Sequence, residues 1–143
     1  MKKLISLSAL FLIMITFTGN KSMAGTAVEP LVFSPDDEKV EVYYFHFSRR
    51  CATCNAVENE AVKALEEYFP EKMENGEITF LSVNIEEEGN EKLAENLAVS
   101  GQALLFVKGD KKIDLTNDAF MNARTKTEKY HKQVKKTVNS LME

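Results

Sequence analysis

Three short runs of apolar, β-branched and aromatic residues constrain the fold of this chain more than any other feature of its sequence. They span residues 40–47, 78–85 and 103–107. The first and third carry few charges, as expected of strands that are buried on both faces. Apolar residues at helical spacing lie between the runs, over 51–69 and 90–98. Strands that alternate with helices in this way predict an α/β domain.

The last third of the chain completes the predicted sheet. Gly109-Asp110 is a turn signal, and residues 112–115 can return from it as an antiparallel strand. From about Thr116 the apolar residues step by three or four positions, which predicts one helix to the end of the chain. A strand–helix–strand start, closed by a hairpin and a final helix, gives a central mixed four-stranded β-sheet with helices on both faces.

The first 24 residues have the pattern of a secretory signal peptide. Lys2 and Lys3 precede an apolar run of 14 residues, and Ser22-Met23-Ala24 places small residues before a cleavage site at Gly25. As a helix the run is about 21 Å long, short of the roughly 30 Å hydrocarbon core of a membrane. An uncleaved membrane anchor is the alternative. We therefore expect cleavage after Ala24 and a periplasmic or secreted protein.

Export would divide the chain into the signal peptide, an extended lead-in over 25–38 and a single domain over 39–143. The signal peptide carries three lysines and no acid, which leaves 15 basic and 22 acidic side chains, a net charge of −7, on residues 25–143. This acidic balance argues against a nucleic-acid-binding protein. Two cysteines are too few for a disulfide-dense scaffold.

Both cysteines belong to the sequence Cys-Ala-Thr-Cys at positions 51–54, between the first predicted strand and the first predicted helix. Cys51 falls at the helix N-terminus, where unpaired backbone N–H groups and the helix dipole stabilise a thiolate. Arg49 and Arg50 directly precede it and favour the same charged form. Cys54 follows one turn later on the same helix face, so it can attack a mixed disulfide formed at Cys51.

A redox dithiol is the interpretation that fits this pair best, and others stay open. A structural disulfide would close a very small loop, and inert thiols are unusual in an oxidising compartment. A structural zinc site needs four ligands, whereas only His46 and His131, the latter expected at the surface, remain as further soft ligands. The two thiolates, with His46 or across a dimer, are an alternative site for Cu(I), zinc or an iron–sulfur centre. A partner-binding module with a vestigial dithiol is the other alternative.

His46 is the nearest titratable side chain that can accept a thiol proton, since it lies five residues before Cys51 on the predicted strand. The competing interpretation is a core histidine hydrogen-bonded to the backbone. Strand alternation favours that second interpretation, because it can point the ring away from the cysteines.

Over roughly residues 39–142 the chain resembles the thioredoxin-like superfamily. The resemblance lies in the strand VYYFHF, the motif RRCATC, the long helix that ends at Pro70, the strand ITFLSVNI and the ALLFV–KGDKKIDL hairpin. It implies a thioredoxin-like fold and a thiol–disulfide oxidoreductase, with Cys51 as exposed nucleophile and Cys54 as buried resolving thiol. The expected partners are a thiol- or disulfide-containing protein substrate and a membrane or soluble redox partner. We expect a monomer with no metal and no organic cofactor, since no glycine-rich phosphate loop is present.

The chain departs from that family in the loop before the third apolar run. The family usually has a cis-proline there, opposite the two cysteines, whereas this chain has Ser100-Gly101-Gln102-Ala103-Leu104. Ala103 matches the proline, and Gln102 and Ala103 form the expected substrate loop. A cis bond before a non-proline residue costs about 2.5–4 kcal/mol, so we expect a trans bond and a less rigid substrate edge. The family's buried acid corresponds to Phe45 here.

Overall fold

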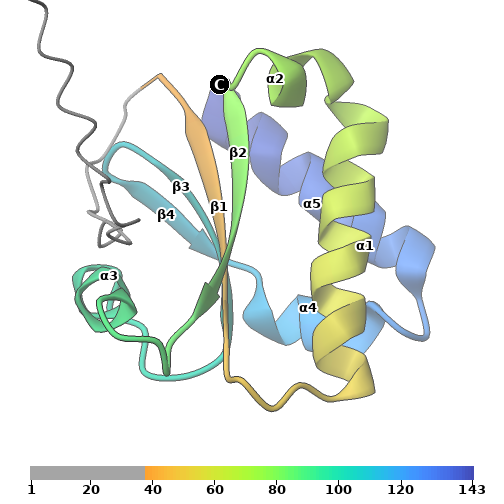
Figure 1. Ribbon diagram of the computed structural model, residues 1–143. Helices are drawn as coiled ribbons and strands as arrows, with labels where there is room; N and C mark the ends of the chain where they lie inside the picture. Colours follow the sequence, from red (N-terminus) through yellow and green to blue (C-terminus); the bar gives the residue numbers. More distant parts are fainter. Residues whose placement is uncertain (1–37) are drawn as a thin grey trace, which may run out of the picture.

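A mixed four-stranded sheet organises the part of the chain that the computed structural model describes, residues 38–143 (Figure 1). The predicted signal peptide, and all but the last residue of the predicted lead-in, lie outside these residues. The strands stand in the order β2-β1-β3-β4. The elements are β1 (Val40–His46), α1 (Ala52–Tyr68), α2 (Pro70–Glu74), β2 (Ile78–Asn84), α3 (Asn90–Asn96), β3 (Ala103–Lys108), β4 (Lys111–Asp114), α4 (Thr116–Asn122) and α5 (Thr127–Met142).

β1 lies in the middle of the sheet and connects its parallel and antiparallel halves. It pairs with β2 in parallel, with His46 opposite Asn84, and with β3 in antiparallel orientation, with Phe45 opposite Ala103. The tight turn between β3 and β4 places Gly109 at a φ of 53°, a left-handed conformation that glycine adopts without strain. The predicted strands, their hairpin and the mixed sheet are thereby confirmed.

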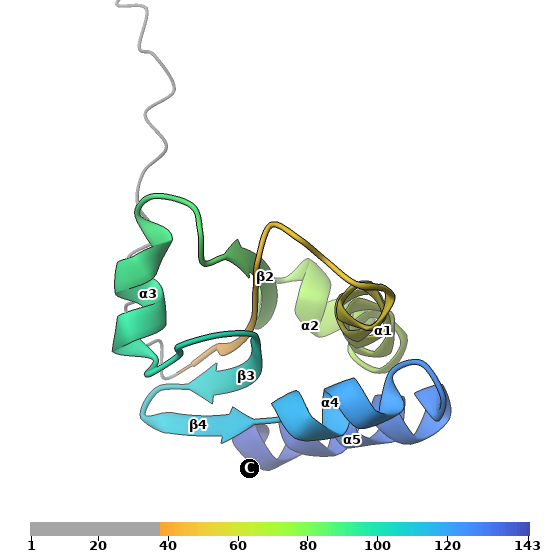
Figure 2. The ribbon, with the colours of Figure 1, turned by 90° about the horizontal axis from the view of Figure 1, so that it is seen from below.

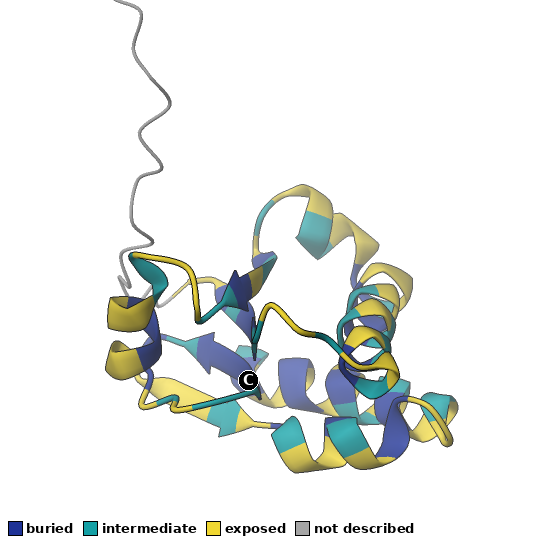
Figure 3. Ribbon diagram, turned by 60° about the horizontal axis from the view of Figure 1, so that its bottom comes forward, coloured by how far each residue is buried: buried dark blue, intermediate teal, exposed yellow. Residues whose placement is uncertain are grey.

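Alternate residues of β1 point to two separate hydrophobic clusters. Val42 and Tyr44 pack with α1, α4 and α5, while Tyr43 and Phe45 pack with the single helix α3 on the other face. Figure 2 shows α3 on one side of the sheet and the larger helical layer on the other. In Figure 3 the two central strands β1 and β3 are largely buried, whereas the edge strand β4 and the outward faces of the helices are exposed. β1 is therefore buried on both faces, as its composition predicts.

None of the helices in residues 38–143 has the length and hydropathy that a membrane-spanning helix requires.

The prediction of one helix from about Thr116 to the end of the chain is wrong, because the segment forms two helices. The backbone N–H groups of Thr125 and Lys126 both donate to the Asn122 carbonyl, at 3.2 and 2.8 Å, and close a turn between α4 and α5. One continuous helix over 116–142 would be about 40 Å long. The turn instead lets both helices contact α1 and the same hydrophobic cluster.

Two buried tyrosines attach the N-terminal half of α1 to its neighbours. The Tyr44 hydroxyl donates to the Cys54 carbonyl and the Tyr130 hydroxyl donates to the Val57 carbonyl, both at 3.0 Å. Tyr44, Val57 and Tyr130 are all fully buried. Burial, above all, raises the pKa of Tyr130, so its hydroxyl remains a donor over the ordinary pH range. The start of α1 is thus fixed by hydrogen bonds as well as by packing.

We predict that Tyr130→Phe lowers the free energy of unfolding by about 1 kcal/mol, because it removes one buried hydrogen bond and keeps the ring. Urea unfolding followed by circular dichroism measures the change. Tyr68→Phe is the matched control, since this partly exposed ring at the C-terminal end of α1 packs beside the Lys135 ammonium. Equal losses for the two variants would contradict the role given to the Tyr130 hydroxyl.

Candidate active site

Cys51 is the N-cap residue of α1 and stands at the end of the loop that follows β1. Its backbone is extended, with φ of −88° and ψ of 168°, and its Sγ accepts a hydrogen bond from the Cys54 backbone N–H at 3.2 Å. Serine, threonine, asparagine and aspartate usually occupy this position, because their oxygen atoms satisfy a free N–H group of the first turn. Here a sulfur atom takes that place.

The two thiols differ sharply in their exposure to solvent. Cys51 is exposed, whereas Cys54, one turn into α1, is only 3% exposed. Hydrogen bonds from the Cys54 side chain and then from its backbone N–H lower the pKa of Cys51, and the backbone N–H groups of Thr53 and of Cys51 itself add to the effect. A helix N-terminus therefore favours the thiolate at the sulfur that solvent can reach.

Cys54 lies between the sheet and the loop that precedes β3. Its Sγ donates a hydrogen bond to Oε1 of Gln102 at 3.5 Å, while its backbone carbonyl accepts from Tyr44. Burial, and then the proximity of Cys54, raises the pKa of Tyr44 to about 12. Tyr44 lies in the apolar run over 40–47, which predicts for it only packing in a buried strand. The signal that could have indicated its hydrogen bond to α1 is a tyrosine hydroxyl on a buried strand just before a cysteine motif.

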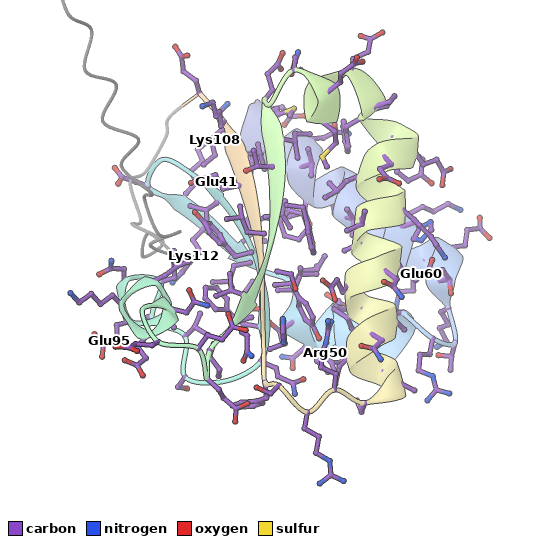
Figure 4. The ribbon with its side chains drawn as sticks, in the orientation of Figure 1. Glu41, Arg50, Glu60, Glu95, Lys108 and Lys112 are labelled. Atoms are coloured by element: carbon purple, nitrogen blue, oxygen red, sulfur yellow. The ribbon has the colours of Figure 1, made fainter. Side chains whose placement is uncertain are left out.

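Arg50 turns inward, and its guanidinium forms an ion pair with Glu58 on α1. It also lies over the Tyr44 ring, 5.5 Å from the ring centroid. Figure 4 shows Arg50 between β1 and the N-terminal part of α1. Burial opposes the charge of Glu58, but hydrogen bonds from Ser82 and Arg50 and the charge of Arg50 keep the pKa of Glu58 below its usual value.

Arg49 is exposed, and together with Arg50 it borders the cysteine pair. The hydrogen bonds that lower the pKa of Cys51 come from Cys54, Thr53 and Cys51 itself. Tuning of the thiolate by the two arginines therefore stays a prediction.

His46 is half-buried at the end of β1, and its Nδ1 lies 2.9 Å from the Phe47 carbonyl oxygen. Its ring is tilted against that of Tyr44, with centroids 5.8 Å apart. Residues 38–143 contain no hydrogen bond between this ring and either cysteine, so proton transfer by His46 stays a prediction.

The loop before β3 comes close to the cysteine pair through Gln102. Ala103 begins β3 opposite Phe45 and is buried, and every peptide bond in residues 38–143 is trans. The expected trans bond at Ala103 is thereby confirmed. The residue that touches Cys54 is the half-buried Gln102.

A cavity of about 410 Å³ opens at the cysteine pair. Phe120 of α4 forms part of its wall, although helical spacing gave this residue only a place in the terminal helix. The same wall includes the two arginines, so the exposed thiol of Cys51 faces both cationic and aromatic groups. The lining residues are Arg49, Arg50, Cys51, Cys54, Gln102 and Phe120.

Metal-binding side chains do not gather in the described part of the chain. No group of three or more histidine, cysteine, aspartate or glutamate side chains suited to a metal ion occurs in residues 38–143. His131 is not the surface residue that was expected, since its side chain is only 14% exposed and its Nε2 lies 2.9 Å from Glu60 on α1.

No protein-family model and no curated protein matches the chain. Among solved structures it is similar to oxidized thioredoxin O2 from Arabidopsis thaliana, with 25% identity over 55% of this chain and 63% of that one, and a TM-score of 0.43. It is also similar to Fasciola hepatica thioredoxin, with 24% identity over 55% and 66% and a TM-score of 0.37. Chlamydomonas reinhardtii thioredoxin f2 is 19% identical over 60% and 75%, with a TM-score of 0.37.

The chain thus spans 63% of the length of the Arabidopsis protein. Its own strand order and connections are those of a thioredoxin-like fold, which confirms the α/β fold class. A Cys-x-x-Cys pair at the start of α1 in this fold supports thiol–disulfide oxidoreductase chemistry in general terms.

We predict that Cys51 in a Cys54→Ser variant is alkylated with a pH midpoint below the value of about 8.5 for free cysteine. The rate rises with pH through the pKa of Cys51, because the thiolate is the nucleophile. Serine keeps a side-chain hydroxyl donor, so a Cys54→Ala variant should have a higher midpoint. A midpoint at or above 8.5 in the serine variant would contradict thiolate stabilisation. Arg49→Ala and Arg50→Ala on the same background should each raise the midpoint, and unchanged midpoints would exclude the arginines as a cause.

Proposed function

We propose that the chain is a thiol–disulfide oxidoreductase that acts on protein disulfides or dithiols in an extracytoplasmic compartment. One observation carries the proposal: the exposed Cys51 caps α1 through its sulfur, with the buried Cys54 one turn behind it. This arrangement favours a thiolate at the accessible position and keeps the second thiol away from other reactants.

The reaction begins with the Cys51 thiolate. It attacks one sulfur of a substrate disulfide, and a bond forms between the two sulfur atoms. The second substrate sulfur leaves with the electron pair of the broken bond and takes up a proton from water. At this stage Cys51 is held in a mixed disulfide with the substrate.

Cys54 completes the exchange. It loses its proton and attacks Sγ of Cys51, which forms the Cys51–Cys54 disulfide and releases the remaining substrate sulfur as a thiol. The substrate disulfide has then gained two electrons and two protons. Both electrons come from the cysteine pair, one proton comes from Cys54, and the other comes from water. The same steps in reverse transfer the disulfide to a substrate dithiol.

The cavity at Cys51 supports a polypeptide substrate. Its volume of about 410 Å³ and its open wall of Phe120, Arg49 and Gln102 leave room for residues on either side of a substrate cysteine. A soluble or membrane-bound redox partner would restore the cysteine pair after each turnover.

We predict that the purified protein shows one reversible transition between dithiol and disulfide in glutathione buffers, detected by alkylation and mass spectrometry. Cys54→Ser should accumulate glutathione on Cys51, because no thiol remains to resolve the mixed disulfide. Cys51→Ser should accumulate far less on the buried Cys54. The absence of a disulfide across the whole range of buffers, or a stoichiometric metal in the protein as purified, would overturn the proposal.

The predicted export of the protein is tested separately, through cleavage of the signal peptide. We predict that the protein expressed in a bacterium begins at Gly25 when the N-terminus is sequenced from the exported fraction. A variant with Ala24→Arg should remain as a precursor, because the position before the cleavage site requires a small side chain. A full-length chain kept in the membrane, in the original protein, would contradict the extracytoplasmic assignment.

A further inference from the structure

Gln102 has a contact that substrate binding alone does not require. Its side-chain oxygen Oε1 accepts a hydrogen bond from the Cys54 thiol at 3.5 Å, across a separation of 48 residues in the sequence. Cys54 is 3% exposed, so water does not readily replace this partner. A buried donor that loses its partner is destabilised by the desolvation that it has already undergone.

The other polar groups at this cavity cannot do the same. Arg49 and Arg50 contribute guanidinium groups, which are donors only, and Phe120 contributes an apolar ring. The remaining side-chain acceptor in the cavity wall is Cys51, whose sulfur is a weak acceptor while it is a protonated thiol. At a pH below the pKa of Cys51, the Gln102 oxygen is therefore the stronger of the two acceptors.

The position of Gln102 also isolates this contact. The residue lines the cavity at the cysteine pair and a second cavity of about 330 Å³ formed by the loop before β3 and the start of α4. When the Gln102 amide is removed, the Cys51 sulfur is therefore the side-chain acceptor that remains beside Cys54 in the wall of the first cavity.

The hydrogen bond exists in one redox state only. The dithiol has an S–H group on Cys54, whereas the Cys51–Cys54 disulfide has none. We propose that Gln102 is a positioning residue that stabilises the dithiol state by holding the proton on Cys54, and so makes the pair more oxidising. The inference rests on the proposed function, since it requires that the two cysteines form a disulfide.

Thiol–disulfide exchange with glutathione measures how strongly Gln102 stabilises the dithiol state. The protein dithiol reduces one molecule of glutathione disulfide to two molecules of glutathione, and its two cysteines lose two electrons and two protons as their bond forms. An interaction present only in the dithiol opposes this reaction.

The test compares purified Gln102→Leu with the original protein at a pH at least one unit below the Cys51 midpoint measured by alkylation. Because S–H is a weak donor, we expect the equilibrium to shift about threefold toward the disulfide. This corresponds to about 14 mV, at roughly 30 mV for each tenfold change in a two-electron couple. Far-UV circular dichroism confirms that each variant is folded.

Two further variants separate the hydrogen bond from other effects. Gln102→Asn keeps the amide but withdraws it by one C–C bond, about 1.5 Å, so it should shift the equilibrium as leucine does. Asn117→Leu removes another amide from the wall of the second cavity, at an exposed position, and should leave the equilibrium unchanged.

The outcomes distinguish failure of the proposed Gln102 role from failure of the proposed oxidoreductase function. An unchanged equilibrium in Gln102→Leu, or an asparagine variant that behaves as the original protein, overturns the role of Gln102 while the proposed function stands. Failure of the original protein to form the disulfide in any glutathione buffer overturns the proposed function itself.

Discussion

The positions of both sulfur atoms depend on how the first turns of α1 are held against β1. Tyr44 binds the carbonyl of Cys54, and Tyr130 binds that of Val57, each at 3.0 Å in a fully buried environment. These bonds fix the helix start from the sheet on one side and from α5 on the other. Cys51, as the capping residue, then has to stand at the surface, and Cys54 has to face inward. The difference in exposure between the two thiols is thus a consequence of helix packing.

Much of this fold could be predicted because the relevant signals are local. The observed bounds of β1, β2 and β3 differ from the predicted ones by at most one residue, since a short apolar run between turn residues already specifies a buried strand. The break between α4 and α5 escaped prediction for an equally physical reason. Helical spacing continues through Ala123 and Tyr130, and no glycine or proline marks the turn, which depends on backbone bonds to the Asn122 carbonyl.

The candidate site was predictable only in part. The two cysteines could be predicted as the reactive pair, because their spacing and their place before a helix are visible in the sequence. The groups that surround them come from elements far apart in the chain, as with Gln102 and Phe120, and local patterning does not report such contacts. The contacts of Arg50 are a second example that local patterning does not report. Its place beside Cys51 predicts thiolate tuning, but no sequence pattern indicates that its guanidinium pairs with Glu58 and lies over the Tyr44 ring.

A sulfur atom at the N-cap links the stability of α1 to the redox state of the pair. A hydroxyl or amide oxygen cap does not change with redox state, but the sulfur of Cys51 accepts the Cys54 N–H most strongly when it is a thiolate. A disulfide sulfur has no charge and is a poorer acceptor. In the proposed exchange, oxidation would therefore weaken the cap, and by thermodynamic linkage the cap would stabilise the dithiol. One interaction at the start of α1 therefore both caps the helix and biases the proposed exchange.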